Sequence, residues 1–147
     1  MSKAEEILAI WKQDAVIDNT QPAHALLDIP KLHSKYLNIL TTHRMRLRSL
    51  NIEMSKLRKK KWAYYSGKMS EEELKTNGWE PFPFVLKTDI ITYLDGDNDI
   101  TNMQSRKAIN EEVVEICISI MKELQSRTWQ LRSYIDYEKF LHGGNLA

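Results

Sequence analysis

A stripe of mostly apolar residues at alternating intervals of three and four runs through the first half of the chain. Its members are Tyr36, Leu40, His43, Leu47, Leu50, Met54 and Leu57. Residues at this spacing share one face of an α-helix, whereas the apolar face of a strand repeats at every second residue. The pattern therefore predicts a long helix from about Lys31 to Tyr65, ended by Ser66-Gly67. Because the stripe is narrow, we expect this helix to be covered on one side only.

The last third of the chain carries a second and wider stripe. Its positions are Val113, Ile116, Ile120, Leu124, Leu131 and Ile135, flanked by Val114, Cys117 and Met121. They predict another long helix, ended by Gly143-Gly144. A chain of 147 residues has limited means of covering two long helices, so we expect part of this surface to be buried between subunits. The residues assigned to that oligomer interface are Ile116, Ile120, Leu124, Leu131 and Ile135.

A shorter helix is predicted at the amino terminus. Ser2 and Glu5 have the spacing of a capping box, in which each side chain satisfies a backbone donor at a helix start. The helix is expected to end near Asp14. The following segment, residues 16–24, is rich in Asp, Asn, Thr and Pro, and it is predicted to be a loop.

The middle of the chain is predicted to contain an insert between the two long helices. Ser70 is expected to cap a brief acidic helical turn, and the Gly and Pro residues of 77–84 exclude a continued helix. Residues 85–94 are rich in β-branched and aromatic side chains, which predicts a strand or hairpin arm. A turn is expected at residues 95–98.

The charge of the chain is concentrated in one segment. Between Arg44 and Lys68, nine cations accompany a single acid, Glu53, which gives this window a charge of +8. The whole chain is only +1, so the remainder carries −7. A helix face that is merely solvated interleaves both signs, because like charges at this density repel one another. An anionic partner would relieve that repulsion.

Aromatic residues follow the cations directly, with Trp62, Tyr64 and Tyr65 after Lys61. Lysine and arginine neutralise phosphates and rings stack on bases, so this combination favours single-stranded nucleic acid. Tyr65 continues the apolar stripe and is expected in the core, whereas internal packing and base stacking both stay open for Trp62 and Tyr64. The candidate DNA-binding residues are Arg44, Arg48, Lys56, Arg58, Lys59, Lys60, Lys61, Lys68, Trp62 and Tyr64.

Other anionic partners compete with this interpretation. A basic helix could instead dock on an acidic protein partner, which would make the chain a helical oligomeric adaptor. A membrane surface is a weaker alternative, since the helix lacks the broad apolar face that interfacial binding needs. Acids near the amino terminus, Glu5 and Glu6, and the lack of a long apolar run predict a soluble, intracellular protein without a membrane partner.

Sequence patterns for catalysis or metal binding are incomplete. Ser66-Gly67-Lys68 resembles the end of a phosphate loop, but Met69 stands where that loop needs a hydroxyl for magnesium. The alternating aspartates of 95–99 resemble the start of a calcium loop, but Ile100 occupies the position of its glycine. No His or Cys pair has zinc spacing. We therefore predict a protein that is not an enzyme, with no catalytic residue, metal or cofactor.

Three segments of the sequence are also shared with a known family. Residues 59–68 read basic-x-basic-hydrophobic-x-Tyr-Tyr-Ser-Gly-basic, and VIDNT at 16–20 and SKYLN at 34–38 precede them in order. In these segments, and at Ser126-Arg127, the chain resembles the UvsY family, the recombination mediators of T4-type bacteriophages. The likeness covers most of the chain and is loose after Lys75, where WEPFPF departs from the family pattern.

The resemblance implies a function in recombination and repair. Family members are not enzymes. They bind single-stranded DNA and weaken the binding of the phage single-strand-binding protein to it. In this way they help a RecA-like phage recombinase to nucleate a filament. The resemblance also implies a ring-like homo-oligomer, a hexamer or heptamer, assembled mainly through the carboxyl-terminal region. Lys59 and Lys61 match the DNA-contacting basic pair of the family. The expected location is the cytoplasm of the infected bacterial host.

The predicted fold class is mainly α, with long helices and a short β or extended insert in the middle, assembling into a ring-like homo-oligomer. We expect one domain over residues 1–147. Within it, residues 1–75 form the basic helical DNA-binding part, 76–100 the loop or strand insert, and 101–147 the helical oligomerisation part.

Overall fold

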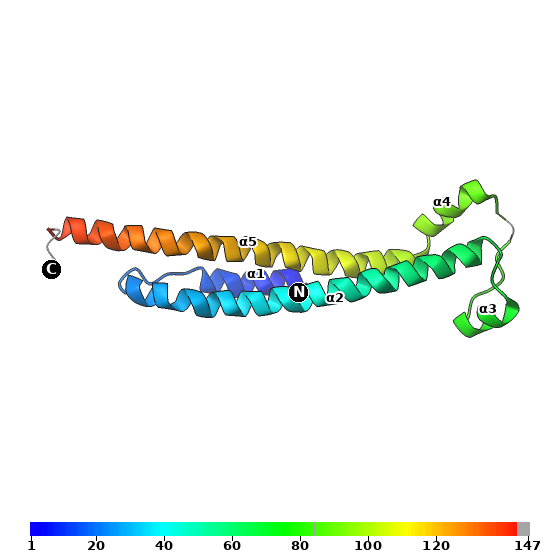
Figure 1. Ribbon diagram of the computed structural model, residues 1–147, viewed down its shortest axis with the longest axis horizontal. Helices are drawn as coiled ribbons and strands as arrows, with labels where there is room; N and C mark the ends of the chain where they lie inside the picture. Colours follow the sequence, from blue (N-terminus) through cyan, green and yellow to red (C-terminus); the bar gives the residue numbers. More distant parts are fainter. Residues whose placement is uncertain (84, 144–147) are drawn as a thin grey trace. The chain divides into compact units, whose positions relative to one another are not determined.

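The computed structural model describes residues 1–83 and 85–143, and its secondary structure within these ranges is helical, with no strand (Figure 1). The helices are α1 (Lys3–Asp14), α2 (Pro22–Tyr65), α3 (Glu71–Asn77), α4 (Ile90–Asp95) and α5 (Asn98–Leu141), with a 3₁₀ turn, η1, at Lys87–Asp89. The chain forms two compact units. The first comprises Met1–Met45 together with the chain from Ile109 onward, and the second comprises Arg46–Ala108. No helix in the described ranges combines the length and the apolarity of a membrane span.

The predicted amino-terminal helix is confirmed as α1. The Ser2 hydroxyl accepts a hydrogen bond from the Glu5 N–H at 3.2 Å, and the Glu5 carboxylate accepts one from the Ser2 N–H at 2.9 Å. This reciprocal pair is the predicted capping box, and it satisfies donors that a helix start otherwise leaves unpaired.

The long helix α2 is confirmed, but it begins earlier than predicted. It starts at Pro22, so residues 22–24 are helical and not part of a loop, and Pro30 lies inside the helix. The first position of a helix tolerates proline well, because its missing N–H would have no partner there. Pro30 removes one backbone hydrogen bond, yet half-buried Leu26 and Ile29 precede it, so packing continues through this stretch of the helix. At the other end the predicted stop is correct, with Gly67 at a φ of 74°.

The predicted strand at residues 85–94 is wrong. This stretch contains η1 and α4, in which Ile90 and Leu94 are buried at a spacing of four. That spacing places both side chains on one face of a helix, and a lone strand would have had no partner strand to pair with. The turn that follows is short: Gly96 ends α4, and α5 begins at Asn98. Gly143, with a φ of 92°, follows the end of α5, while Gly144 lies outside the described residues.

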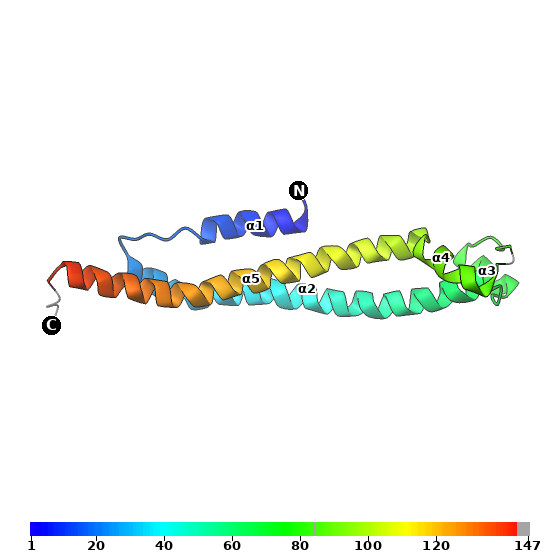
Figure 2. The same cartoon turned by 90° about the horizontal axis from the view of Figure 1, so that it is seen from above.

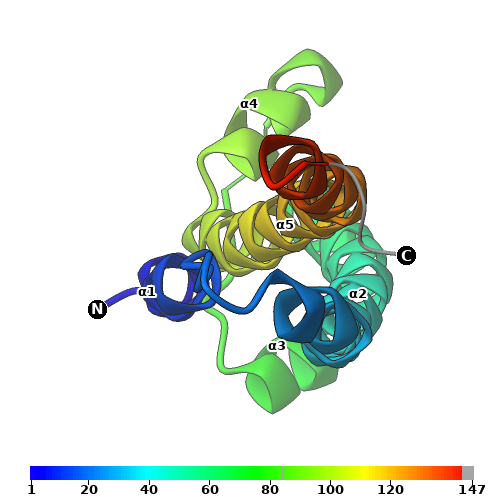
Figure 3. The same cartoon turned by 90° about the vertical axis from the view of Figure 1, so that its left-hand side faces the viewer.

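The core of the first unit is formed by side chains of α1, the first half of α2 and the middle of α5. Figures 2 and 3 show these helices from above and from one end. Its buried members are Ile7, Tyr36, Leu40, Val113, Cys117, Ile120 and Leu124. The stripe of α5 is therefore covered largely by helices of the same chain. Leu124 is 0% exposed, and Ile120 and Leu131 are each 4% exposed. This corrects the expectation that these three side chains are available to another subunit, whereas Ile116 and Ile135 are half-buried.

Arg127 ties the end of α1 to α5. Its guanidinium is buried and donates hydrogen bonds to the carbonyl oxygens of Asp14, at 3.0 Å, and Ala15, at 3.1 Å. The Asp14 carboxylate in turn accepts hydrogen bonds from Lys35, at 2.6 Å, and Tyr36, at 2.7 Å. Although partial burial opposes the charged form, these two donors hold the pKa of Asp14 below its usual value. The end of α1 is thus hydrogen-bonded to both long helices of this unit.

Candidate nucleic-acid interface

The basic segment of α2 lies mainly in the second unit, where one side of the helix is buried. Met54, Leu57 and Tyr65 pack against a core formed by Ile90, Leu94 and Ile100. These three α2 positions are three and eight residues apart, and such spacings bring side chains to one face of an α-helix. They therefore define the inward side of α2. Residues half a turn away from them face outward.

Most of the predicted DNA-binding cations of α2 are exposed to solvent. The exposed members in this unit are Arg48, Lys56, Arg58, Lys59 and Lys60, with Lys68 just after the helix. None of them forms an ion pair with another residue in the part of the chain that the structure describes. Arg44 is also exposed, but it belongs to the first unit. Among the described residues, this dense positive charge therefore has no paired counter-charge.

Trp62 lies beside these cations and is 43% exposed. It follows Ser55 and Lys59 at intervals of seven and three, and Ile52, 54% exposed, precedes Lys59 by seven. At this spacing the outward side of α2 combines cations with two apolar groups that a base could contact. We name Arg48, Lys56, Arg58, Lys59, Lys60 and Trp62 the basic face.

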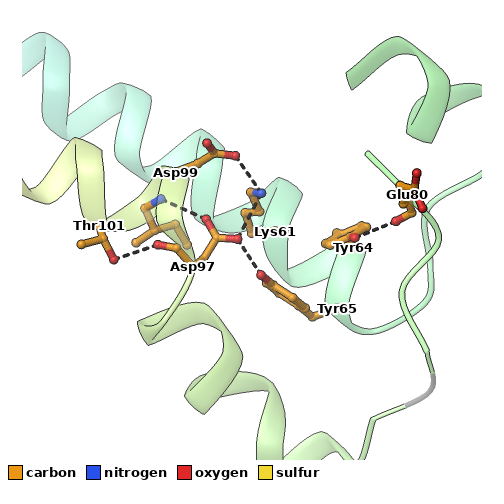
Figure 4. A network of polar contacts seen from close by, with 8 residues as sticks. Lys61, Tyr64, Tyr65, Glu80, Asp97, Asp99 and Thr101 are labelled. Carbon is orange, nitrogen blue, oxygen red and sulfur yellow. Dashed lines mark hydrogen bonds and ion pairs between the residues drawn. The ribbon is translucent and has the colours of Figure 1, made fainter. Parts of the chain in front are cut away.

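Lys61 does not belong to this exposed surface, contrary to the sequence prediction. Its side chain is only 6% exposed, and its Nζ atom lies 3.1 Å from Asp97 Oδ2 and 2.9 Å from Asp99 Oδ2 (Figure 4). The ammonium also sits 4.0 Å from the centroid of the Trp79 ring. Lys61 is four residues after Leu57 and four before Tyr65, so the helix turns it toward the inward side. That spacing was visible in the sequence and would have identified its orientation.

Asp97 is the centre of the polar network around Lys61. The residue is 5% exposed, and its carboxylate accepts hydrogen bonds from the Tyr65 hydroxyl at 2.6 Å and from the Ile100 N–H at 3.0 Å. Burial opposes its charge, but these hydrogen bonds and the Lys61 ammonium together hold the pKa of Asp97 below its usual value. For Lys61, burial acts against the charge as well, yet Asp99 and Asp97 raise its pKa above the usual value. Both partners are therefore charged at neutral pH.

Tyr64 is half-buried, and both its hydroxyl and its ring already have partners within the protein. Its hydroxyl donates a hydrogen bond to the Glu80 carbonyl at 2.6 Å (Figure 4). Its ring contacts those of Trp79 and Phe82 at centroid distances of 5.3 and 5.6 Å. The centroid of the Tyr65 ring lies 4.8 Å from that of Phe82 and 5.7 Å from that of Tyr93. Tyr65 is therefore packed within the protein, as its place on the apolar stripe predicted. No sequence pattern identified Trp79 and Phe82 as partners of these tyrosines. Only the density of aromatic residues in this segment hinted at such a cluster.

Two of the alternating aspartates of 95–99 have partners within the fold. Asp97 and Asp99 bind Lys61, and Asp97 also caps the start of α5 through the Ile100 N–H. Over the ranges that the structure describes, no group of three or more His, Cys, Asp or Glu side chains could hold a metal ion.

Comparisons with known proteins point to one family. A family model described as "Recombination, repair and ssDNA binding protein UvsY" matches residues 10–144. Crystal structures of the recombination mediator protein UvsY of bacteriophage T4 share the fold. One of them has 20% sequence identity and a TM-score of 0.82 over 97% of this chain and 100% of that chain. A second crystal form has 19% identity and a TM-score of 0.83 over 94% and 98% of the two chains. No curated protein matches the chain by sequence.

Proposed function

Because the chain belongs to the UvsY family of recombination, repair and single-stranded-DNA-binding proteins, we propose that it is a recombination mediator that binds single-stranded DNA through the basic face. The observation that carries this proposal is the run of exposed cations at Arg58, Lys59 and Lys60, none of which is paired with an acid among the described residues. A polyanion is the partner that such a surface favours, because each phosphate that it engages releases condensed counterions.

The basic face supports binding that is independent of base sequence. Lysine and arginine side chains contact phosphates, which are the same for every nucleotide. Trp62 offers a half-exposed ring close to Lys59, and stacking of one base is worth about 1 to 3 kcal/mol whatever the base. Arg44, before these residues in the sequence, and Lys68, after them, are also exposed and are further candidates for phosphate contacts. Lys61 and Tyr64 contribute to the fold beneath this surface and not to the contacts.

Loading of a recombinase needs binding that is strong overall but easily released. We propose that the protein acts as a ring-like homo-oligomer, a hexamer or heptamer, in which each subunit presents one basic face. Several weak sites on one strand raise the effective concentration of each, while no single contact is indispensable. A strand held in this way can be taken from a phage single-strand-binding protein and passed to a RecA-like phage recombinase. The setting would be the cytoplasm of the infected bacterium, and the step needs neither a cofactor nor catalysis.

The surface available for assembly differs from the one that the sequence predicted. Near the end of α5, Trp129 is 72% exposed, Tyr137 57% and Phe140 75%. Their spacing brings them to one side of the helix, and large exposed apolar groups mark interaction sites. We therefore propose that these three side chains replace Leu124 and its buried neighbours as the subunit contacts.

The salt dependence of binding tests the proposal. If each subunit engages about five phosphates, the logarithm of the affinity for oligo-dT falls against the logarithm of salt concentration with a slope of roughly −3 to −4. Fluorescence anisotropy with labelled oligo-dT at several salt concentrations measures it, and a mixed-sequence oligonucleotide should behave alike. An affinity that salt does not change would contradict the proposal. A failure to bind any oligonucleotide would favour the alternative, an adaptor whose basic helix binds an acidic protein.

A further inference from the structure

We propose that Lys61 is a positioning residue, which holds the basic face in its binding arrangement without itself contacting DNA. The inference rests on the proposed function, because it assigns a role within single-stranded DNA binding. It separates Lys61 from Lys59, although both lie in the same cationic run and only two positions apart. Lys59 is exposed, whereas Lys61 is enclosed by Asp97, Asp99 and the Trp79 ring.

The ammonium of Lys61 is already paired with negatively charged groups, which are what a phosphate would supply. It lies within 3.1 Å of two carboxylates and 4.0 Å from the Trp79 ring centroid. If it turned outward to DNA, the Asp97 side chain, which is 4% exposed, would keep its charge without its cationic partner. An unpaired buried charge is far more costly than a phosphate contact in water is favourable. Lys61 therefore stays inside when DNA binds.

The network also fixes the last turns of α2. Lys61 and Tyr65 both bind Asp97, which belongs to the start of α5. Helix ends fray unless other groups hold them, and Lys59, Lys60 and Trp62 lie in this end of α2. With the end held, DNA meets cations that are already in place, and less conformational entropy is lost on binding.

Lys61 has a second effect through charge. It neutralises two aspartates that lie directly beneath the cationic run of α2. Without it, these carboxylates would repel the phosphates that Lys59 and Lys60 attract. A loss of DNA affinity after substitution of Lys61 would therefore reflect exposed negative charge and a loosened helix end, and not a lost phosphate contact.

Three variants of the full chain separate positioning from contact. Lys59→Met removes an exposed cation, and Lys61→Met removes the buried one. The third variant combines Lys61→Met with Asp97→Asn and Asp99→Asn, so that the carboxylates lose their charge together with their partner. Each is measured by thermal unfolding and by oligo-dT affinity at several salt concentrations.

We expect Lys59→Met to keep the melting temperature and to make the salt slope shallower by about 0.7, the value for one phosphate contact. Lys61→Met should lower the melting temperature by roughly 10 °C and weaken DNA binding, because buried Asp97 loses its counter-charge. The combined variant should regain most of the melting temperature and bind oligo-dT with the affinity and slope of the wild type. A wild-type salt slope in this variant would show that no phosphate contact was lost with Lys61, because the slope counts those contacts.

Two results would overturn the inference. One is a Lys61→Met protein with an unchanged melting temperature and the shallower slope of Lys59→Met. The other is a combined variant that folds as the wild type does but keeps the DNA-binding defect. If Lys61→Met does not fold, the combined variant decides between the two roles by itself. A wild-type protein that binds no oligo-dT would refute the proposed function, and a role in DNA binding for Lys61 with it.

Discussion

Replacement of Arg58, Lys59 and Lys60 by glutamine is expected to weaken binding of oligo-dT roughly fiftyfold near physiological salt, because three phosphate contacts are lost. The salt slope should become shallower by about 2, at about 0.7 per contact. All three side chains are exposed and unpaired among the described residues, so the free energy of unfolding should change by less than about 0.5 kcal/mol. Anisotropy titrations and denaturant unfolding of the same preparations measure both quantities.

A matched variant controls for net charge. Lys12, Lys122 and Lys139 are exposed cations outside the basic face, and their replacement by glutamine removes the same total charge. This control should bind oligo-dT with nearly the wild-type slope, because no phosphate contact is lost. Equal losses of affinity in the two triple variants would mean that overall charge, and not the basic face, attracts the nucleic acid.

Leu124→Ala is expected to lower the free energy of unfolding by about 3 kcal/mol, since it removes a large side chain from a closed core. Leu124 is 0% exposed and packs with Ile120 and Cys117 in the first unit. Because these contacts lie within one chain, the shift of the unfolding transition should be the same at low and high protein concentration. Chemical unfolding followed by circular dichroism measures it at both concentrations.

The neighbouring residue supplies the control for this prediction. Gln125 is exposed on the same turn of α5, and Gln125→Ala should change the free energy of unfolding by less than about 0.5 kcal/mol. If Leu124→Ala instead left unfolding unchanged and reduced the mass measured by light scattering, Leu124 would be a subunit contact, as the sequence alone suggested. The core assignment would then be wrong.

The long helices could be predicted from the sequence because their signals are local. The stripe from Tyr36 to Leu57 and the Ser2–Glu5 capping box each involve residues only a few positions apart, and α2 and α1 follow them. The start of α2 was misjudged because Pro30 resembles a boundary and no local signal shows the packing that continues the helix. The strand over 85–94 was misjudged because β-branched composition outweighed the spacing of Ile90 and Leu94.

The site could be predicted only in part, because charge is visible in a sequence while its partners are not. The cations of α2 form a run that predicts an anionic partner, but Asp97 and Asp99 lie on a distant segment that folding brings to Lys61. The place of Lys61 between Leu57 and Tyr65 was the available clue. For α5, an apolar stripe predicts burial without showing whether the cover is α1 and α2 of the same chain or a second subunit.

Amine labelling of the lysines, read by mass spectrometry with and without oligo-dT, distinguishes lysines that bind phosphates from lysines that are buried in the fold. We expect Lys59 and Lys60 to be labelled in the free protein and protected by DNA. Lys61 should stay unlabelled in both states, because its side chain is 6% exposed and bound to two carboxylates. Equal labelling of Lys59 and Lys60 with and without bound oligo-dT would contradict this expectation.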